Sequence, residues 1–214
     1  MLFGIGGQSS AEDGLLVSPD RVPPPERDIG PDAAPAESVA ILGGGCFWCV
    51  DGVYRLIEGV LDAVSGYVGG AAETANYRDV CTGNSGHAEV VRVRFDPARI
   101  SYGQILRIFF AIAHDPTQLN RQGNDIGTQY RSAIFTDDPA QREVAEAYIR
   151  QLSDADLFAA PIVTGIEPLE AFYEAEDYHQ DYAALNPAQP YIACIALPKV
   201  NKLRQYFPDM LKQS

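Results

Sequence analysis

The sequence predicts an α+β domain in which a mixed β-sheet is flanked by helices. Short runs of alternating apolar residues, typical of strands, are interspersed after Ser38 with segments of helical apolar spacing. The chain has 214 residues, of which 46% are hydrophobic, and this length suits one substantial core. We therefore expect a single catalytic domain over residues 38–214.

The elements of this domain follow one another from Ser38. A strand over 38–44 leads through a glycine turn into a helix over 46–58, which ends before Gly59. Further strands are predicted at 60–68, 89–95, 130–135 and 161–166, and further helices at 101–112 and 139–152. Residues 114–129 form a long polar loop without structure of its own, a kind of loop that is often functional. The expected architecture is a two-layer sandwich of the ferredoxin-like type.

Residues 1–37 are predicted to be a flexible N-terminal extension. They are rich in proline and glycine, including the run Pro23, Pro24 and Pro25, and have little periodicity. They lack the basic and apolar regions of a signal peptide, and no run in the chain approaches the ~20 apolar residues that span a bilayer. We expect a cytoplasmic protein with no membrane partner.

The charge balance bears on the class of partner. Sixteen Lys and Arg residues stand against twenty-nine Asp and Glu residues, for a net charge of −13. Such a field repels phosphate backbones, so nucleic acid is not an expected partner.

The four cysteines are Cys46, Cys49, Cys81 and Cys194, too few to indicate a disulfide framework. Cys46 follows three glycines at a predicted helix N-terminus, where free N–H groups and the helix dipole lower a thiol pKa. We therefore expect Cys46 to be a nucleophile. Cys81 has no basic neighbour except Arg78, and we expect it to be buried and inert.

Cys49 completes a C-x-x-C motif with Cys46. This spacing would let Cys49 resolve a sulfenic acid on Cys46 as a disulfide, and it also suits a metal. Zinc would need two further ligands, and neither remaining cysteine lies at short spacing from a histidine. We rank redox chemistry above metal binding and expect no metal.

Several other side chains are candidates for a site. Phe47 and Trp48 are two adjacent aromatics, which either belong to the core or line a pocket. Glu89 begins an apolar strand, where burial would raise its pKa and make it an acid; a solvated strand-end carboxylate is the commoner alternative. His87 is expected to bond to backbone. The loop around Asp125 and Tyr130 is dense in donors and acceptors, which favours a shaped polar wall.

The motifs taken together resemble the type A peptide methionine sulfoxide reductases. The resemblance rests on GCFW at 45–48, GYVGG at 66–70, YRDVCTGNSGHAEVV from Tyr77, FDPARISY at 95–102, HDPTQLNRQGNDIGTQYRS at 114–132 and AEDYHQDY at 175–182. These segments occur in order over most of the chain, and their combination is highly specific.

The resemblance implies a reaction and a set of roles. Cys46 would attack the sulfur of methionine S-sulfoxide and become a sulfenic acid, while Glu89 protonates the oxygen. Tyr77 and Tyr130 would hydrogen-bond that oxygen with help from Asp125, and Phe47 and Trp48 would enclose the S-methyl group.

Recycling departs from the commonest pattern of the resembled family. Many relatives carry the resolving cysteine directly after a tyrosine near the C-terminus, but here Tyr191 is followed by Ile192 and the nearest thiol is Cys194. We prefer Cys49 as the resolving thiol, with Cys194 as the alternative. The resemblance implies thioredoxin as reductant, or dithiothreitol in vitro, with no bound cofactor.

The expected substrates are oxidised proteins or peptides containing methionine S-sulfoxide, and also the free amino acid, acted on by a monomer. Two other classes stay open: a general C-x-x-C dithiol oxidoreductase, and a non-enzymatic metal-binding domain.

Overall fold

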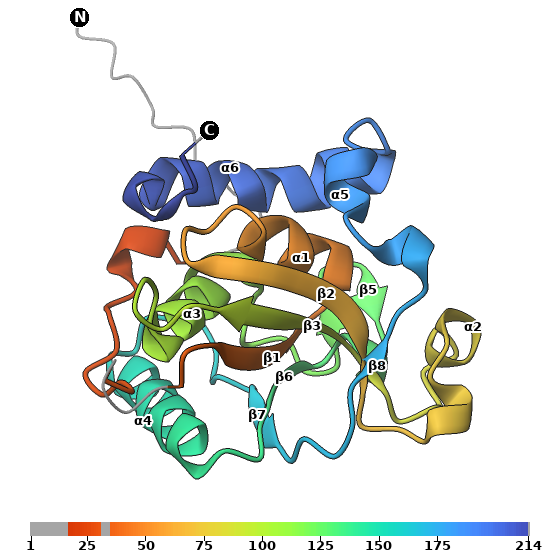
Figure 1. The fold of residues 1–214 in the computed structure, drawn as a ribbon, viewed down its shortest axis with the longest axis horizontal. Helices are drawn as coiled ribbons and strands as arrows, with labels where there is room; N and C mark the ends of the chain where they lie inside the picture. The colour runs from red at the N-terminus through yellow and green to blue at the C-terminus, as the bar shows by residue number, and fades with distance from the viewer. Residues whose placement is uncertain (1–16, 31–34, 214) are drawn as a thin grey trace, which may run out of the picture.

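A six-stranded mixed sheet forms the centre of the protein (Figure 1). The computed structural model describes residues 17–30 and 35–213. The strand order is β7–β6–β1–β3–β2–β8, and every neighbouring pair is antiparallel except β6 and β7. The strands are β1 (Ser38–Gly44), β2 (Val60–Val68), β3 (Ala88–Phe95), β6 (Ser132–Phe135), β7 (Gly165–Glu167) and β8 (Tyr173–Glu174).

Among the described helices, those that begin at Phe47, Tyr102 and Pro139 lie close to predicted positions, and the other three were not predicted. They are α1 (Phe47–Tyr54), α2 (Tyr77–Val80), α3 (Tyr102–Ile108), α4 (Pro139–Asp154), α5 (Tyr182–Leu185) and α6 (Leu197–Tyr206). Ser101 begins α3 with a capping box that includes Gln104, and Asp138 caps α4 ahead of Pro139. Helix α1 ends at Tyr54, four residues before the predicted end, and α3 continues into a π-helical turn over Phe109–Ala113.

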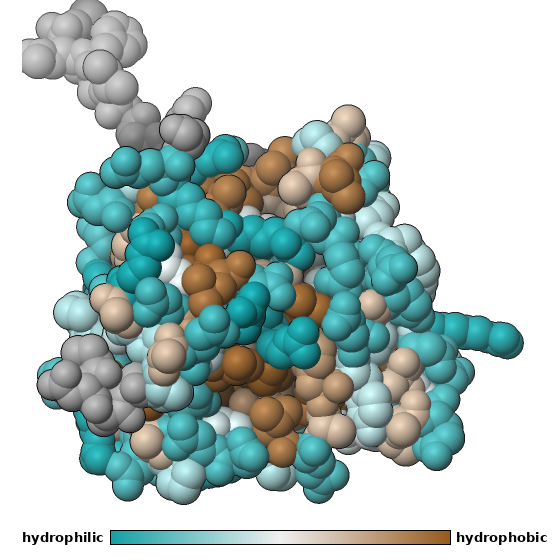
Figure 2. Space-filling model, in the orientation of Figure 1, coloured by the Kyte–Doolittle hydropathy of each residue, from teal (hydrophilic) through white to brown (hydrophobic). Residues whose placement is uncertain are grey.

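Strand alternation divides the buried residues of the sheet between two clusters. Ala40 and Leu42 belong to the main core, which contains residues of α1, α3 and α4. Ile41 points the other way and packs with Phe135 in a smaller cluster, which the segment between β7 and β8 covers. Figure 1 shows α1 between the sheet and α6, and Figure 2 shows hydrophobic surface near the middle of the same view, surrounded by hydrophilic residues. The α+β class is therefore confirmed.

The predicted unstructured loop at 114–129 contains a two-stranded hairpin, so this part of the prediction was wrong. Its strands are β4 (Arg121–Gln122) and β5 (Asp125–Ile126). The hairpin rests on Gly45, which has φ +88°; a Cβ there would lie 2.5 Å from Cγ of Gln122. Glycine at 45 is therefore required by both backbone conformation and close approach, and the contact brings Asp125 toward α1.

Residues 17–30 correct the prediction of a flexible extension over 1–37. Val22 is fully buried, and the Tyr148 hydroxyl donates a hydrogen bond to the carbonyl of Pro23 at 2.6 Å. Asp28 accepts from the backbone N–H of Gly103 at 2.8 Å. This part of the predicted extension is thus packed against α3 and α4, while residues 1–16 and 31–34 lie outside the described residues. In the described part of the chain, every helix is too short or too polar to cross a membrane.

Candidate functional site

Cys46 lies where the structure joins the end of β1 to the start of α1. It is the N-cap residue of α1, as predicted, and 9% of its surface is exposed. The next residue, Phe47, donates its backbone N–H to Oε2 of Glu89 at 3.1 Å. Glu89 stands on β3, the strand beside β1. Sheet pairing therefore places this carboxyl group at the start of α1, beside Cys46.

Glu89 is a buried acid. Only 2% of it is exposed, and burial raises its pKa to about 8, although the hydrogen bond from Phe47 acts in the opposite direction. The carboxyl group is consequently protonated at neutral pH and is able to donate a proton. The solvated carboxylate, which the sequence position alone favours, is therefore wrong, and the alternative of a buried acid with a raised pKa is the one that holds.

The two thiols of the C-x-x-C motif form a buried hydrogen-bonded pair. Burial raises the pKa of the Cys46 thiol, and its bond with Cys49 and the nearby Glu89 raise it further. The bond with Cys46 lowers the pKa of Cys49 to about 7, against the effect of burial. Burial thus opposes the predicted lowering of the Cys46 pKa in the substrate-free protein, and Cys49 is the more acidic thiol of the pair.

A cavity of about 310 Å³ opens onto this pair. Its lining includes Cys46, Cys49, Asp125, Tyr191, Cys194 and Lys199. The Tyr191 hydroxyl donates to Oδ2 of Asp125 at 2.5 Å and accepts from Sγ of Cys49 at 3.8 Å. Asp125 is thus connected to the thiols through Tyr191, a residue that the sequence analysis did not assign to the site.

Tyr77 and Tyr130 both lie near Glu89 and Cys46. Burial raises the pKa of both hydroxyls, and the hydrogen bond with Cys81 raises that of Tyr77 further. Both tyrosines therefore keep their protons and can donate hydrogen bonds. The backbone N–H of Tyr77 donates to Oε1 of Glu176 at 2.9 Å, which anchors the start of α2.

The aromatic pair after Cys46 divides between core and surface. Phe47 is 1% exposed and belongs to the core, while Trp48 is partly exposed. The Trp48 ring stacks on Tyr182 with centroids 3.9 Å apart and planes 11° apart. Its indole N–H donates to Nδ1 of His179 at 3.2 Å. Phe47 thus belongs to the core and Trp48 packs against it at the surface, and neither residue lines the cavity at Cys46.

The two remaining cysteines are exposed, whereas His87 is buried. Cys81 is exposed and forms a hydrogen bond with Tyr77, so the prediction of a buried thiol is wrong. Cys194 is also exposed, on a π-helical turn that leads into α6. His87 is buried and bonds to the backbone of Gly70 and Ala71, as predicted.

Sequence reasoning missed four residues of the site: Tyr191, His179, Tyr182 and Lys199. His179 and Tyr182 lie in the segment 175–182, whose side chains were explained equally well by pairing within a helix. The segment instead forms a single 3₁₀ turn, Asp177–His179, followed by α5. Lys199 carries no local signal, because only the docking of α6 brings it to the cavity.

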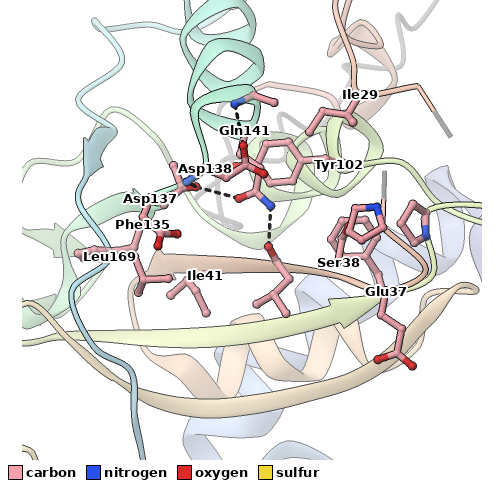
Figure 3. Close-up of a pocket in the computed structure, with 16 residues that line it drawn as sticks. Ile29, Glu37, Ser38, Ile41, Tyr102, Phe135, Asp137, Asp138, Gln141 and Leu169 are labelled. Carbon is pink, nitrogen blue, oxygen red and sulfur yellow. Dashed lines mark hydrogen bonds between the residues drawn. The ribbon is translucent and has the colours of Figure 1, made fainter. Parts of the chain in front are cut away.

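A second cavity, of about 280 Å³, lies elsewhere on the molecule (Figure 3). It is lined by Ile41 and Tyr102, and by Gln141, whose Nε2 donates to the carbonyl of Val39 at 2.8 Å. None of the four cysteines lines it. The thiol chemistry therefore belongs to the first cavity. Within residues 17–30 and 35–213, no group of three or more His, Cys, Asp or Glu side chains is arranged to hold a metal ion.

Comparison with known proteins points to one family. The sequence model described as "Peptide methionine sulfoxide reductase" matches residues 38–211. The chain is 52% identical over 181 residues to "Peptide methionine sulfoxide reductase MsrA 2" of Mesorhizobium japonicum, covering 85% of this chain and 93% of that protein. It is 46% identical over 210 residues to the protein of the same name from Synechocystis sp., covering 96% and 98%.

Solved structures are similar as well. Mxr1 from Saccharomyces cerevisiae in reduced form has a TM-score of 0.64 at 35% identity, over 72% of this chain and 88% of that one. Methionine sulfoxide reductase A of Corynebacterium diphtheriae has a TM-score of 0.61 at 38% identity, over 73% and 78%.

Proposed function

This chain belongs to the peptide methionine sulfoxide reductase family, and we propose that it reduces methionine S-sulfoxide with Cys46 as its nucleophile. The observation that carries the assignment of roles is the placement of a protonated Glu89 at the start of α1, beside Cys46, whose thiol lines an open cavity. A sulfoxide needs both a sulfur nucleophile and a proton for its oxygen, and these two residues supply them.

In the proposed reaction, the sulfur of Cys46 attacks the sulfoxide sulfur while Glu89 protonates the oxygen. Oxygen passes to Cys46, which becomes a sulfenic acid, and methionine leaves. The proton of the Cys46 thiol has a route to Cys49 through the hydrogen bond between them. In the substrate-free protein Cys49 is the more acidic of the two thiols. Substrate binding therefore has to favour the thiolate on Cys46 instead.

Two pairs of side chains would orient the substrate. Tyr77 and Tyr130 keep their protons and would hydrogen-bond the sulfoxide oxygen as it gains negative charge. The buried Phe47 and the partly exposed Trp48 would contact the S-methyl group. His179 and Tyr182 hold the indole of Trp48 in place. Asp125 would support the network through Tyr191.

Cys49 is proposed to resolve the sulfenic acid. Its thiol already contacts that of Cys46, whereas Cys194 lies on the exposed turn at the edge of the same cavity. The proposed reductant of the Cys46–Cys49 disulfide is thioredoxin, replaced by dithiothreitol in vitro, and the proposed substrates are oxidised proteins and peptides.

The test is turnover of a peptide methionine S-sulfoxide with dithiothreitol. Cys46→Ser should abolish methionine formation, and Cys49→Ser should keep one turnover while losing the thioredoxin-driven cycle. The R-sulfoxide peptide, which has the same composition, serves as the control and should not be reduced. Insulin reduction stronger than sulfoxide reduction, or full cycling by Cys49→Ser, would contradict the proposal.

A further inference from the structure

The C-terminal helix α6 is packed directly on α1, the helix that carries the thiols (Figure 1). Leu203 is fully buried and Val200 is 5% exposed, so this face of α6 belongs to the core. A Cβ at Gly52 of α1 would lie 3.8 Å from Cγ2 of Val200, which shows how closely the helices approach. The segment around Lys199 is therefore held in one position relative to Cys49.

Lys199 is fixed at the wall of the thiol cavity. Its ammonium group donates a hydrogen bond to the carbonyl of Ala113 at 2.7 Å, at the end of the π-helical turn after α3. The side chain is half-buried and lines the cavity together with Cys46 and Cys49. A tethered cation beside two buried thiols stabilises a thiolate more than a mobile, solvated lysine would.

The other charges at this site favour the protonated thiol. The hydrogen bond with Cys46 lowers the pKa of Cys49 most, and burial raises it. Lys199 is the charge that lowers this pKa, whereas the charge of Asp125 raises it. The whole chain carries a net charge of −13, which gives the protein a negative electrostatic potential. The ammonium group of Lys199 opposes that potential at the thiol cavity.

We propose that Lys199 is a positioning residue for recycling, which favours the thiolate form of Cys49 that resolves the sulfenic acid. This inference rests on the resolving role proposed for Cys49. The Cys49 thiolate attacks the sulfur of the Cys46 sulfenic acid; the S–S bond forms as the S–O bond breaks. Hydroxide leaves with the electron pair and takes up a proton to become water. Cys49 is oxidised, Cys46 is reduced, and Lys199 transfers no proton.

The test compares Lys199→Met with Lys199→Arg, and uses Lys212→Met as the matched control. Lys212 also donates to a backbone carbonyl, that of Arg55, but this residue follows the far end of α1. Alkylation of Cys49, mapped by mass spectrometry as a function of pH, reports its thiolate fraction. Stopped single turnovers separate methionine formation from disulfide formation.

Lys199→Met should raise the apparent pKa of Cys49 by about one unit and slow disulfide formation roughly fivefold at pH 7. The deficit should vanish above about pH 9, where the thiol ionises without help. Methionine formation should slow less than disulfide formation, because in that step Cys49 serves only as acceptor of the Cys46 proton. Lys199→Arg should restore the second step, and Lys212→Met should behave as wild type.

An unchanged Cys49 titration in Lys199→Met, or a deficit of the same size at high pH, would overturn the proposal. If that variant fails to fold, Lys199→Gln supplies a second neutral side chain for the same measurements. Failure of the proposed function gives a different result: either no methionine forms in the wild type, or Cys49→Ser still forms the recycling disulfide.

Discussion

Glu89 is neutral at physiological pH because the fold withholds water from it. The pKa of Glu89 is about 8 in the folded protein, against an ordinary value of 4.5. The protonated carboxyl group therefore contributes its full stabilisation of the fold below about pH 4.5, and this stabilisation is lost as pH rises through 8. Holding the proton donor in place therefore destabilises the protein at neutral pH.

Glu89→Gln should lose activity and gain stability. Glutamine can still accept the hydrogen bond from Phe47, but it carries no transferable proton, so sulfoxide turnover should fall by about 10²–10⁴-fold. At pH 7.5 its free energy of unfolding should exceed that of the wild type by an amount on the order of 2–4 kcal/mol, and the two should converge near pH 4.5. Urea denaturation of both proteins at pH 7.5 and pH 4.5 measures the two free energies of unfolding. The same difference between variant and wild type at both pH values would contradict the prediction.

Single residues were predictable from sequence where local chemistry decides their state. Three glycines predicted the helix-start position of Cys46. The position of Glu89 at the start of an apolar strand left a solvated carboxylate as the commoner alternative, and only the family resemblance pointed to an acid. The pKa of Cys46 was not predictable, because it depends on burial and on its bond with Cys49. Cys81 was misjudged because its apolar neighbours say nothing of which side of a short helix faces solvent.

At the scale of elements, helix starts were the most predictable features. Ser101 and Asp138 cap α3 and α4 as their side-chain chemistry requires, and these contacts are local in sequence. The hairpin at β4–β5 is local, but each of its strands has only two residues, too few for a period to be recognised. The packing of residues 17–30 depends on contacts with distant parts of the chain, which periodicity does not encode. Asp28, for example, binds both the hydroxyl of Ser101 and the backbone of Gly103.

Ser101→Ala should destabilise the protein by about 1 kcal/mol, because it removes the acceptor for the N–H of Gln104 and the bond with Asp28. Ser153→Ala is the matched control: its hydroxyl bonds only within α4, to the carbonyl of Ile149 at 2.7 Å, and it should change stability by less than about 0.5 kcal/mol. Chemical denaturation compares the two. Equal losses would show that the cap and the Asp28 contact contribute nothing specific.

For the whole molecule, the net charge of −13 acts on every substrate that approaches. A sulfoxide peptide with flanking lysines should have a kcat/KM roughly three- to tenfold higher than its glutamate-flanked counterpart at low ionic strength. The ratio should approach one near 0.5 M salt, where the screening length is only about 4 Å. Steady-state assays over a salt series measure it, and a ratio independent of salt would assign the preference to direct contacts.

The α+β class was predictable for the whole molecule because strand and helix periods alternate along the chain. The ferredoxin-like type, the monomeric state, the cytoplasmic location and flexibility of residues 1–16 stay predictions. The sequence did not predict that α6 places Lys199 at the cavity of the two thiols, because no motif near Lys199 indicates where this helix packs.

The docking of α6 on α1 also has a consequence for the order of events during synthesis. Both thiols leave the ribosome long before residue 199 does, so the newly made cysteines have the reactivity of ordinary thiols. Lys199 comes to lie beside Cys49 only after α6 has packed on α1. A nascent chain or a fragment cut before α6 would thus carry the nucleophile without the means of renewing it efficiently at neutral pH.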